Sequence, residues 1–367
     1  MRAATVARSW SAQIAAASPV AGLADATPLR ALLLEEMPLE AHFRRDHFPA
    51  PDLRPGEWAV EVTGAVRRPL RLDIGALHEL GQRTETVVLE CAGHRRTEYS
   101  PPAPGLAWAE GAVGEARWTG TPLAALLKRA GVLPSASAVA LEGADSGPFD
   151  GRDGSHPFAR ALPLAKALAP EVALVWEVNG APIPVRRGGP VRAIVPGWYA
   201  TDSVKWLTRI TVLETEFTGP WEAEDYRYRA PGETGPGERM TALPVHALVV
   251  DPGPHAVLIP GATTVRGVAW GGTGGVDRVE IRIDGGDWLP AQLGPWRGAY
   301  ARRFWTAPWT ATAGRHHIEV RATDGTGQAQ PEGVRWNPGG YANNAVHGVA
   351  VSVSLPPSAR TRDACSH

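Results

Sequence analysis

The chain is organised around the stretch Val87-Val88-Leu89-Glu90-Cys91-Ala92-Gly93-His94-Arg95-Arg96. Its opening apolar run predicts a buried strand, and the small residues after the run predict a turn. That turn brings the thiol of Cys91 close to two guanidinium groups. Because fixed positive charge stabilises a thiolate, we expect the pKa of Cys91 to lie below that of a free thiol. Such a sulfur is a soft-metal ligand or a nucleophile, and the alternative is a buried structural thiol.

The composition is that of a globular protein with two or three domains. Its 367 residues exceed one compact core. The 37 basic and 38 acidic residues leave a formal net charge of -1. We therefore expect no nucleic-acid partner, and any anion site has to be a local cluster of charge. Apolar runs stay well below the roughly 20 residues of a transmembrane helix, so we expect no membrane span.

The two cysteines, Cys91 and Cys365, exclude a disulfide framework, a zinc ribbon and a Cys-x-x-Cys-His haem attachment. Cys365 lies in a polar tail, residues 356–367, that we expect to be disordered. The first 26 residues lack both the twin-arginine pair and the long apolar core of an export signal. We expect a cytoplasmic protein, with the periplasm as the alternative.

Changes in sequence pattern divide the chain into an N-terminal arm (1–37), a first domain (38–238), a second domain (239–355) and the tail. In the first domain we expect strands at 58–64, 84–90, 139–143, 172–178, 191–197, 203–207 and 210–212, helices at 72–80, 122–130 and 162–168, and a connection at 108–118. This mixture predicts an α+β domain. The second domain, after the Pro/Gly-rich linker 231–237, has alternating patterns at 247–250, 264–270, 277–283, 299–305, 316–322 and 346–353. Such strands, separated by glycine-rich turns, predict an immunoglobulin-like β-sandwich.

The hexapeptide Cys91 to Arg96 resembles the Cys-Ala-Gly-Asn-Arg-Arg signature of the sulfite oxidase family of molybdenum-cofactor oxidoreductases. Other motifs similar to the family's follow in order across residues 38–353: Phe43 to Pro49, Gly105 to Trp108, Gly188 to Gly197 with Ser203 to Leu207, Asp225-Tyr226, and Trp336 to Asn344. The chain looks like the bacterial sulfite dehydrogenases, a molybdenum core without a haem domain. The resemblance implies an α+β molybdopterin-binding domain of the sulfite oxidase fold, then an immunoglobulin-like dimerisation domain and hence a homodimer.

The resemblance also implies a role for each matching residue. Cys91 would bind molybdenum, and the molybdopterin would be held by His47, Arg187, Arg192, Ser203 and Lys205 together with Cys91. The sulfite pocket would contain Arg45, Arg96, Trp108, Tyr226 and, from the second domain, Arg303. Guanidinium groups hold oxoanions with charge-assisted hydrogen bonds worth roughly 1.5–3 kcal/mol each. Considered alone, Arg192 and Lys205 also suit surface charges, His47 a loop histidine and Arg303 a solvated strand edge.

Two positions depart from the family pattern. His94 stands where the signature has Asn, and could tune the site near neutral pH. Arg187 stands where animal members have His and adds positive charge near the expected cofactor.

The implied reaction is oxidation of sulfite to sulfate by oxo transfer at molybdenum, with the electrons passed to an external acceptor such as a cytochrome. We expect no haem on this chain. One alternative is a reductase of nitrate or another oxoanion on the same scaffold. The other is a cofactor-free protein whose sandwich mediates binding or assembly.

Overall fold

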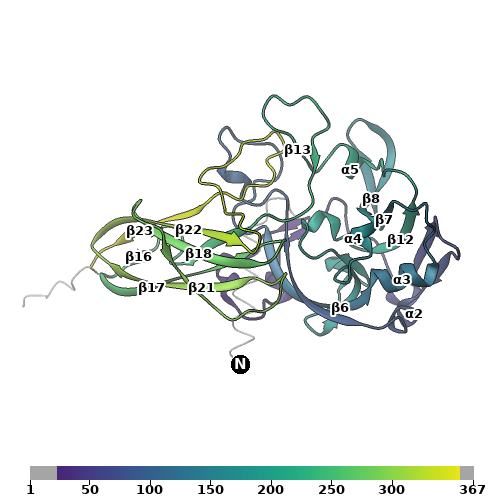
Figure 1. Ribbon diagram of the computed structural model, residues 1–367, viewed down its shortest axis with the longest axis horizontal. Coiled ribbons are helices and arrows are strands. Elements are labelled where there is room, and N and C mark those ends of the chain that lie inside the picture. The colour runs from purple at the N-terminus through teal and green to yellow at the C-terminus, as the bar shows by residue number, and fades with distance from the viewer. Residues whose placement is uncertain (1–22, 356–367) are drawn as a thin grey trace, which may run out of the picture.

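The structure is a computed structural model that describes residues 23–355. Figure 1 shows a mixed α+β body beside a β-sandwich. The first strand of the sandwich is β15 (His246–Asp251). The fold class predicted from the sequence, an α+β domain followed by an immunoglobulin-like sandwich, is confirmed. The tail expected to be disordered, residues 356–367 with Cys365, lies outside the described residues.

Two five-stranded sheets form the first domain. One has the order β10 (Ala181–Pro182), β9 (Ala173–Val178), β6 (Val113–Pro122), β5 (Arg83–Glu90), with β11 (Arg192–Ile194) also paired to β9. The other has the order β4 (Leu70–Leu72), β3 (Val60–Gly64), β12 (Leu207–Leu213), β7 (Ala138–Phe149), β8 (Arg152–Pro163). The short helices are α2 (Ile74–His78), α3 (Leu123–Ala130), α4 (Leu164–Ala167) and α5 (Pro220–Ala223). The largest hydrophobic cluster draws on both sheets and on α3.

Two long strands of this domain differ from the sequence prediction. Residues 113–118, expected to be part of a connection, open β6, the strand that pairs with both β5 and β9. Nearly every residue of β6 is buried, so the strand lacks the alternation that marks a half-exposed strand. β8 begins ten residues before the short helix expected at 162–168 and pairs with β7. Its opening, which contains Gly154 and Pro157, gives little β-strand signal.

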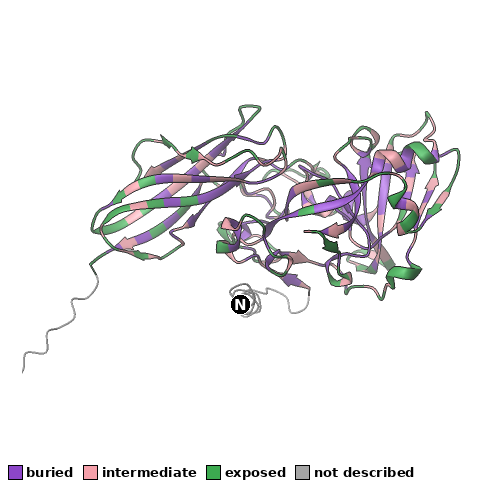
Figure 2. Ribbon diagram, turned by 90° about the horizontal axis from the view of Figure 1, so that it is seen from below, coloured by how far each residue is buried: buried purple, intermediate pink, exposed green. Residues whose placement is uncertain are grey.

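Two antiparallel-rich sheets form the second domain. One has the order β15, β17 (Gly261–Trp270), β21 (Arg303–Ala311), β20 (Gln292–Leu293). The other has the order β16 (Val257–Leu258), β23 (His347–Val353), β22 (Gly314–Asp324), β18 (Val276–Ile283), β19 (Leu289–Pro290). Buried and exposed residues alternate along strands such as β23, as Figure 2 shows for the sandwich. The predicted strand at 299–305 starts later, at Arg303.

The described part of the N-terminal arm joins the two domains. It contains β1 (Ala24–Asp25), which pairs with β2 (Arg44–Arg45), and the 3₁₀ turn η1 (Leu29–Leu33). Leu32 and Met37 are buried in a cluster with Val88 of β5 and Trp270 of β17. The arm is therefore part of the core between the domains.

Short elements complete the first domain and the crossing to the second. They are the 3₁₀ turns η2 (Leu39–Ala41), η3 (Pro55–Glu57), η4 (Arg96–Glu98), η5 (Val185–Arg187) and η6 (Ala200–Asp202), and the two-residue strands β13 (Arg227–Tyr228) and β14 (Glu238–Arg239). The β13–β14 ribbon projects from the body of the molecule in Figure 1.

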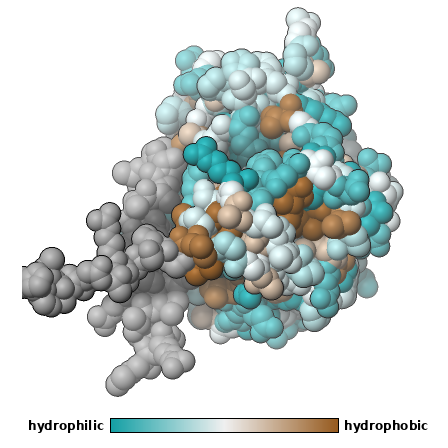
Figure 3. Space-filling model, turned by 90° about the vertical axis from the view of Figure 1, so that its left-hand side faces the viewer, coloured by the Kyte–Doolittle hydropathy of each residue, from teal (hydrophilic) through white to brown (hydrophobic). Residues whose placement is uncertain are grey.

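The end of the sandwich farthest from the first domain faces the viewer in Figure 3, where hydrophilic side chains surround small apolar patches. Exposed apolar side chains of the second domain include Val257, Ile259 and Leu355. Among residues 23–355, no helix has both the length and the apolar character needed to cross a membrane.

A loop of the second domain, residues 336–346, forms hydrogen bonds with the turn that follows β5. We call this contact the clasp. Arg95, whose side chain is almost fully buried, donates to the carbonyl oxygens of Ala345 at 2.6 Å and Val346 at 3.1 Å. The amide of Ala342 donates to the carbonyl of Ala92 at 3.0 Å, one residue after Cys91. The position of the Cys91 turn thus depends on the second domain.

Substituting Arg95 tests the clasp. Arg95→Met keeps the aliphatic stem but leaves the partly buried carbonyl of Val346 without its donor, and it also removes both guanidinium donors from the carboxylate of Glu98. The carbonyl of Ala345 keeps a hydrogen bond from Gln330 at 3.0 Å. Each buried polar group left unpaired costs about 1–3 kcal/mol, so the free energy of unfolding should fall by at least about 2 kcal/mol. Urea denaturation followed by tryptophan fluorescence measures this change. Arg117→Met, which removes an exposed 3.5 Å ion pair with Glu36, is the control and should shift stability by under about 0.5 kcal/mol. Equal effects from both variants would contradict the clasp.

Candidate active site

Cys91 lies directly after β5, on a wall shared by two cavities. Its amide donates to the carbonyl of Ala112 at 2.9 Å, which continues the pairing of β5 with its neighbour by one residue. Burial raises the pKa of the Cys91 thiol, and the Gly93 amide and the charges of Arg96 and Arg45 only partly oppose this shift. The prediction that the pKa of Cys91 is lowered is therefore wrong, because the cost of desolvating the thiolate outweighs its stabilisation by the nearby positive charge.

The first cavity has an empty volume of about 830 Å³. It is lined by residues from several separated parts of the chain, including the predicted Arg45, His47, Cys91, Arg187, Arg192, Ser203, Lys205 and Tyr226. The sequence prediction did not include four other polar residues on this wall, His42, Arg44, Asp145 and Thr201. Every residue predicted to hold the cofactor thus lines this one cavity.

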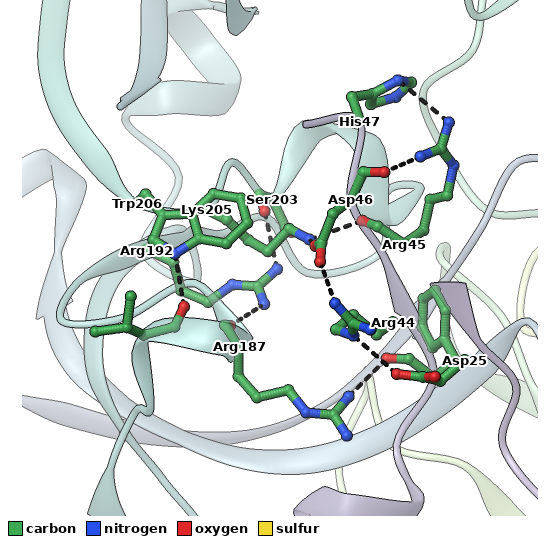
Figure 4. A network of polar contacts seen from close by, with 12 residues as sticks. Asp25, Arg44, Arg45, Asp46, His47, Arg187, Arg192, Ser203, Lys205 and Trp206 are labelled. Atoms are coloured by element: carbon green, nitrogen blue, oxygen red, sulfur yellow. Dashed lines mark hydrogen bonds and ion pairs between the residues drawn. The ribbon is translucent and has the colours of Figure 1, made fainter. Parts of the chain in front are cut away.

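Most of the positively charged side chains in this cavity donate hydrogen bonds to main-chain carbonyl groups. Arg187 donates to the carbonyls of His42 at 2.7 Å and Glu40 at 3.2 Å. Arg192 donates to those of Arg187 at 3.1 Å and Ser203 at 2.9 Å. In the described part of the chain, the Nε of each guanidinium is buried without a hydrogen-bond partner. Carbonyls orient these groups without cancelling their charge (Figure 4).

Burial makes this charge unfavourable while no anion is present. It lowers the pKa of both Arg187 and Arg192 to about 10. It lowers the pKa of Lys205 to about 8, although Lys205 forms an ion pair with Asp46 and donates to the carbonyl of Arg45 at 2.7 Å. An anionic ligand would remove this penalty, so the cavity suits a group that carries negative charge.

Ser203 contributes a hydroxyl group to the same cavity. Its oxygen accepts a hydrogen bond from the amide of Val195 at 3.0 Å, which leaves its own hydrogen to donate to a ligand.

The second cavity, with an empty volume of about 960 Å³, meets the first at Cys91, Arg45, His47 and Tyr226. Its wall also holds the predicted residues Arg96 and Trp108. The pocket predicted for an oxoanion is therefore assembled next to the sulfur, with Arg45 from β2 and Arg96 from the turn after β5.

Three side chains on the shared wall form a hydrogen-bonded series. Nη2 of Arg45 lies 3.3 Å from Nδ1 of His47, and Nε2 of His47 lies 2.6 Å from the hydroxyl of Tyr226. Burial lowers the pKa of His47 well below its usual range, so the ring is neutral. Since guanidinium can only donate, Nδ1 accepts and Nε2 carries the hydrogen that is donated to Tyr226. Burial also raises the pKa of Tyr226, so its phenol stays protonated and its hydrogen is free to donate into the pocket.

Arg96 is fitted into a slot formed by glycines. Its Nε, Nη1 and Nη2 donate to the carbonyls of Gly340, Leu106 and Gly339, each at 3.1 Å. A Cβ on Gly93 would lie 2.6 Å from the guanidinium carbon, and one on Gly105 would lie 2.7 Å from Nη1. Because a guanidinium has five N–H groups, donors remain for a ligand in the pocket.

Arg303 does not reach either cavity. Its guanidinium donates to the carbonyls of Val276 at 3.2 Å and Gly294 at 3.0 Å, inside the sandwich domain. The prediction that Arg303 supplies a third arginine is therefore wrong, because its strand, β21, holds it within the second domain.

His94 is also turned away from the cavities. Its buried ring packs edge-on against His246 at 5.6 Å and Trp270 at 5.8 Å, between the domains. Burial lowers its pKa well below the usual range, so it stays neutral near neutral pH. The suggestion that His94 tunes the site near neutral pH is wrong.

The second domain instead contributes Tyr341, which the sequence analysis included only in the family-like motif Trp336 to Asn344 and gave no role in the pocket. Tyr341 and Gly339 line the second cavity through the clasp. No local sequence signal marks Tyr341 as a pocket residue, because its neighbours in the pocket come from the other domain.

Comparisons with known proteins agree with this geometry. Residues 47–221 match the family model of the oxidoreductase molybdopterin binding domain, and residues 238–354 match that of the Mo-co oxidoreductase dimerisation domain. The chain is 35% identical to sulfite oxidase of Gallus gallus, over 88% of this chain and 75% of that protein. It is 35% identical to mitochondrial sulfite oxidase of Mus musculus, over 85% of this chain and 60% of that protein. It thus spans less than two thirds of the mouse protein's length.

More distant similarities extend the comparison. The chain is 33% identical to the NADH nitrate reductase of Spinacia oleracea, over 87% of this chain but 38% of that protein. Among solved structures, the sulfane dehydrogenase SoxCD of Paracoccus pantotrophus superposes with a TM-score of 0.79 at 24% identity, covering 91% of this chain and 87% of that one. This last similarity shows that the two share a fold.

The pKa of Lys205 leads to a testable pH dependence. Folding lowers this pKa from 10.5 to about 8, so between these values the unfolded chain binds more protons than the folded one. The free energy of unfolding of the cofactor-free protein should therefore rise as the pH increases from 8 toward 10, whereas the full penalty is present below pH 8. Urea titrations across this range measure the slope. Lys205→Met should lose part of it and Lys128→Met, an exposed substitution on α3, should keep it. Identical slopes would refute the assignment.

Proposed function

The chain belongs to the sulfite oxidase family, and on that premise we propose that it is a molybdenum-dependent oxidoreductase that oxidises sulfite to sulfate. The observation that carries the proposal is the meeting of Cys91, Arg45, Arg96 and Tyr226 where a cationic cavity joins an open pocket.

The residues of the first cavity fit a molybdopterin cofactor. Arg187, Arg192 and Lys205 supply buried positive charge suited to its phosphate, and Ser203 supplies a hydrogen-bond donor. Cys91 would be the protein ligand of the metal; among residues 23–355, no group of three or more His, Cys, Asp or Glu side chains could hold a metal ion by itself. When bound, this cofactor supplies the two-electron redox chemistry that adds an oxygen atom to sulfite.

The chain's own residues would bind and orient the substrate anion. Arg45 and Arg96 offer guanidinium donors beside Cys91, and each charge-assisted hydrogen bond is worth roughly 1.5–3 kcal/mol. The phenol of Tyr226, with its hydrogen directed away from His47, would donate to a substrate oxygen. Trp108, only 2% exposed, forms an apolar wall that limits water in the pocket.

The overall reaction converts sulfite and water into sulfate, two protons and two electrons. We propose that the electrons pass to an external acceptor such as a cytochrome, with no haem on this chain. We also propose a homodimer, which the match of residues 238–354 to a dimerisation domain supports. The cytoplasmic location expected from the sequence stays a prediction, because residues 1–22 lie outside the described part.

A second candidate function is the reduction of nitrate, which the similarity to spinach nitrate reductase supports. Steady-state assays of the molybdenum-loaded protein discriminate the two: sulfite with ferricyanide as acceptor, and nitrate with a reduced viologen as donor. We expect turnover in the first assay. Turnover in the second alone would reject sulfite oxidation, and protein that stays free of molybdenum in a replete host would indicate a cofactor-free binding or assembly protein.

Cys91→Ser tests the metal ligand. Replacing sulfur by a harder, less acidic hydroxyl should abolish sulfite turnover and lower the molybdenum content, while the thermal unfolding midpoint of the cofactor-free protein stays near that of the wild type. Metal analysis and steady-state kinetics measure both effects. Substantial remaining activity would reject the assigned role.

Gly93→Ala tests the slot that positions Arg96. The added methyl would meet the guanidinium, the movable end of a side chain, so Arg96 should be displaced and the fold kept. We expect KM for sulfite to rise about tenfold, roughly 1.4 kcal/mol. Gly56→Ala, where a Cβ meets nothing within 4 Å, is the matched control. If the two variants have the same KM, Arg96 does not bind the substrate.

A further inference from the structure

The wall of the second cavity that comes from the second domain is formed by the clasp, and its largest side chain there is Tyr341. Both main-chain groups of Tyr341, the amide and the carbonyl, form hydrogen bonds. Its amide donates to Oδ1 of Asn337 at 3.1 Å, and its carbonyl accepts from the hydroxyl of Tyr99 and from Nδ2 of Asn337. The ring therefore has a defined place in the pocket.

The side chain of Tyr341 contacts three residues of the second cavity, Arg96, Tyr226 and Asp225. The guanidinium carbon of Arg96 lies 5.1 Å from the ring centre, within the range of a cation–π contact. The ring of Tyr226 stacks on it with 5.6 Å between centres and 24° between planes. Its hydroxyl donates to Oδ1 of Asp225 at 2.6 Å. Tyr341 thus links the anion-binding arginine to the phenol donor and to a carboxylate.

The carboxylate of Asp225 is unusual in a pocket for an anion. It lines the same cavity as Arg45 and Arg96, and an uncompensated negative charge there would repel an oxoanion. Asp225 accepts from the amide of Tyr226 at 2.7 Å and from Tyr341, so both of its donors belong to the tyrosine pair. Burial raises the pKa of Tyr341, which keeps this hydroxyl protonated and able to donate.

We propose that Tyr341 is a positioning residue for the substrate anion: it supports the guanidinium of Arg96 and neutralises part of the charge of Asp225 through its hydroxyl. The second domain therefore sets the anion affinity of a pocket whose metal ligand lies in the first. This inference rests on the proposed function only in taking an oxoanion as the ligand.

The test uses the molybdenum-loaded protein and two measurements. Isothermal titration calorimetry with inorganic sulfate measures anion binding, and steady-state kinetics with sulfite separates KM from kcat. Tyr341→Phe removes only the donor to Asp225, and should raise Kd for sulfate and KM for sulfite by about three- to tenfold with kcat within twofold. Asp225→Asn removes the charge and should lower both constants. In the Asp225→Asn background, Tyr341→Phe should have no further effect.

Tyr300→Phe is the matched control. Tyr300 is also a tyrosine of the second domain whose hydroxyl bonds a carboxylate of the first, that of Glu171, but it lines neither cavity. It should leave Kd and KM within twofold of the wild type. If Tyr341→Phe behaves like Tyr300→Phe, or weakens binding equally with and without the charge of Asp225, the inference is overturned.

The two proposals fail separately. A wild-type protein that binds sulfate, responds to these variants as described and yet turns over no sulfite would reject the proposed function and support the inference. Normal sulfite turnover with no response to Tyr341→Phe would do the opposite.

Discussion

Main-chain carbonyl groups orient the arginines on which this structure depends. Arg96 donates to carbonyls of the clasp, and Arg187 and Arg192 donate to carbonyls around the first cavity. Arg95 differs, because it donates to carbonyls of the clasp and also pairs with the carboxylate of Glu98. A carboxylate partner would fix such a group and also cancel its charge, whereas a carbonyl fixes it and leaves the charge available. The protein can therefore present guanidinium groups to an anion in a chain whose formal net charge is only -1.

The shared wall of the two cavities follows the same logic. Burial lowers the pKa of His47 and raises that of Tyr226, so neither group adds a charge at neutral pH. Arg45 fixes the tautomer of His47, and that tautomer directs the phenol. Arginine side chains therefore supply the positive charge where the cavities meet, and the neutral side chains of His47 and Tyr226 fix the direction of the hydrogen-bond donor.

Local patterns predicted the parts of the molecule that local chemistry decides. The strand that ends just before Cys91, the helix at 122–130 and the sandwich all follow the apolar patterns from which they were predicted. β6 was missed because burial along nearly its whole length removes that periodicity. Tyr341 was missed because its partners in the pocket lie in the other domain, such as Asp225, 116 positions away. Arg303 was misjudged because carbonyls of its own domain, those of Val276 and Gly294, hold its guanidinium away from the pocket. The pKa of Cys91 was misjudged because the sequence shows neighbouring charges but not the exclusion of water.

The clasp limits how the two domains can be separated during evolution. Carbonyl groups of residues 339–346 accept four hydrogen bonds from the guanidinium groups of Arg95 and Arg96. Residues 23–238 do not provide these acceptors. A gene fusion that carried the first domain alone to a new context would carry an unfinished pocket. The two domains are therefore expected to be inherited and recombined as one unit, with partners added at its outer edges.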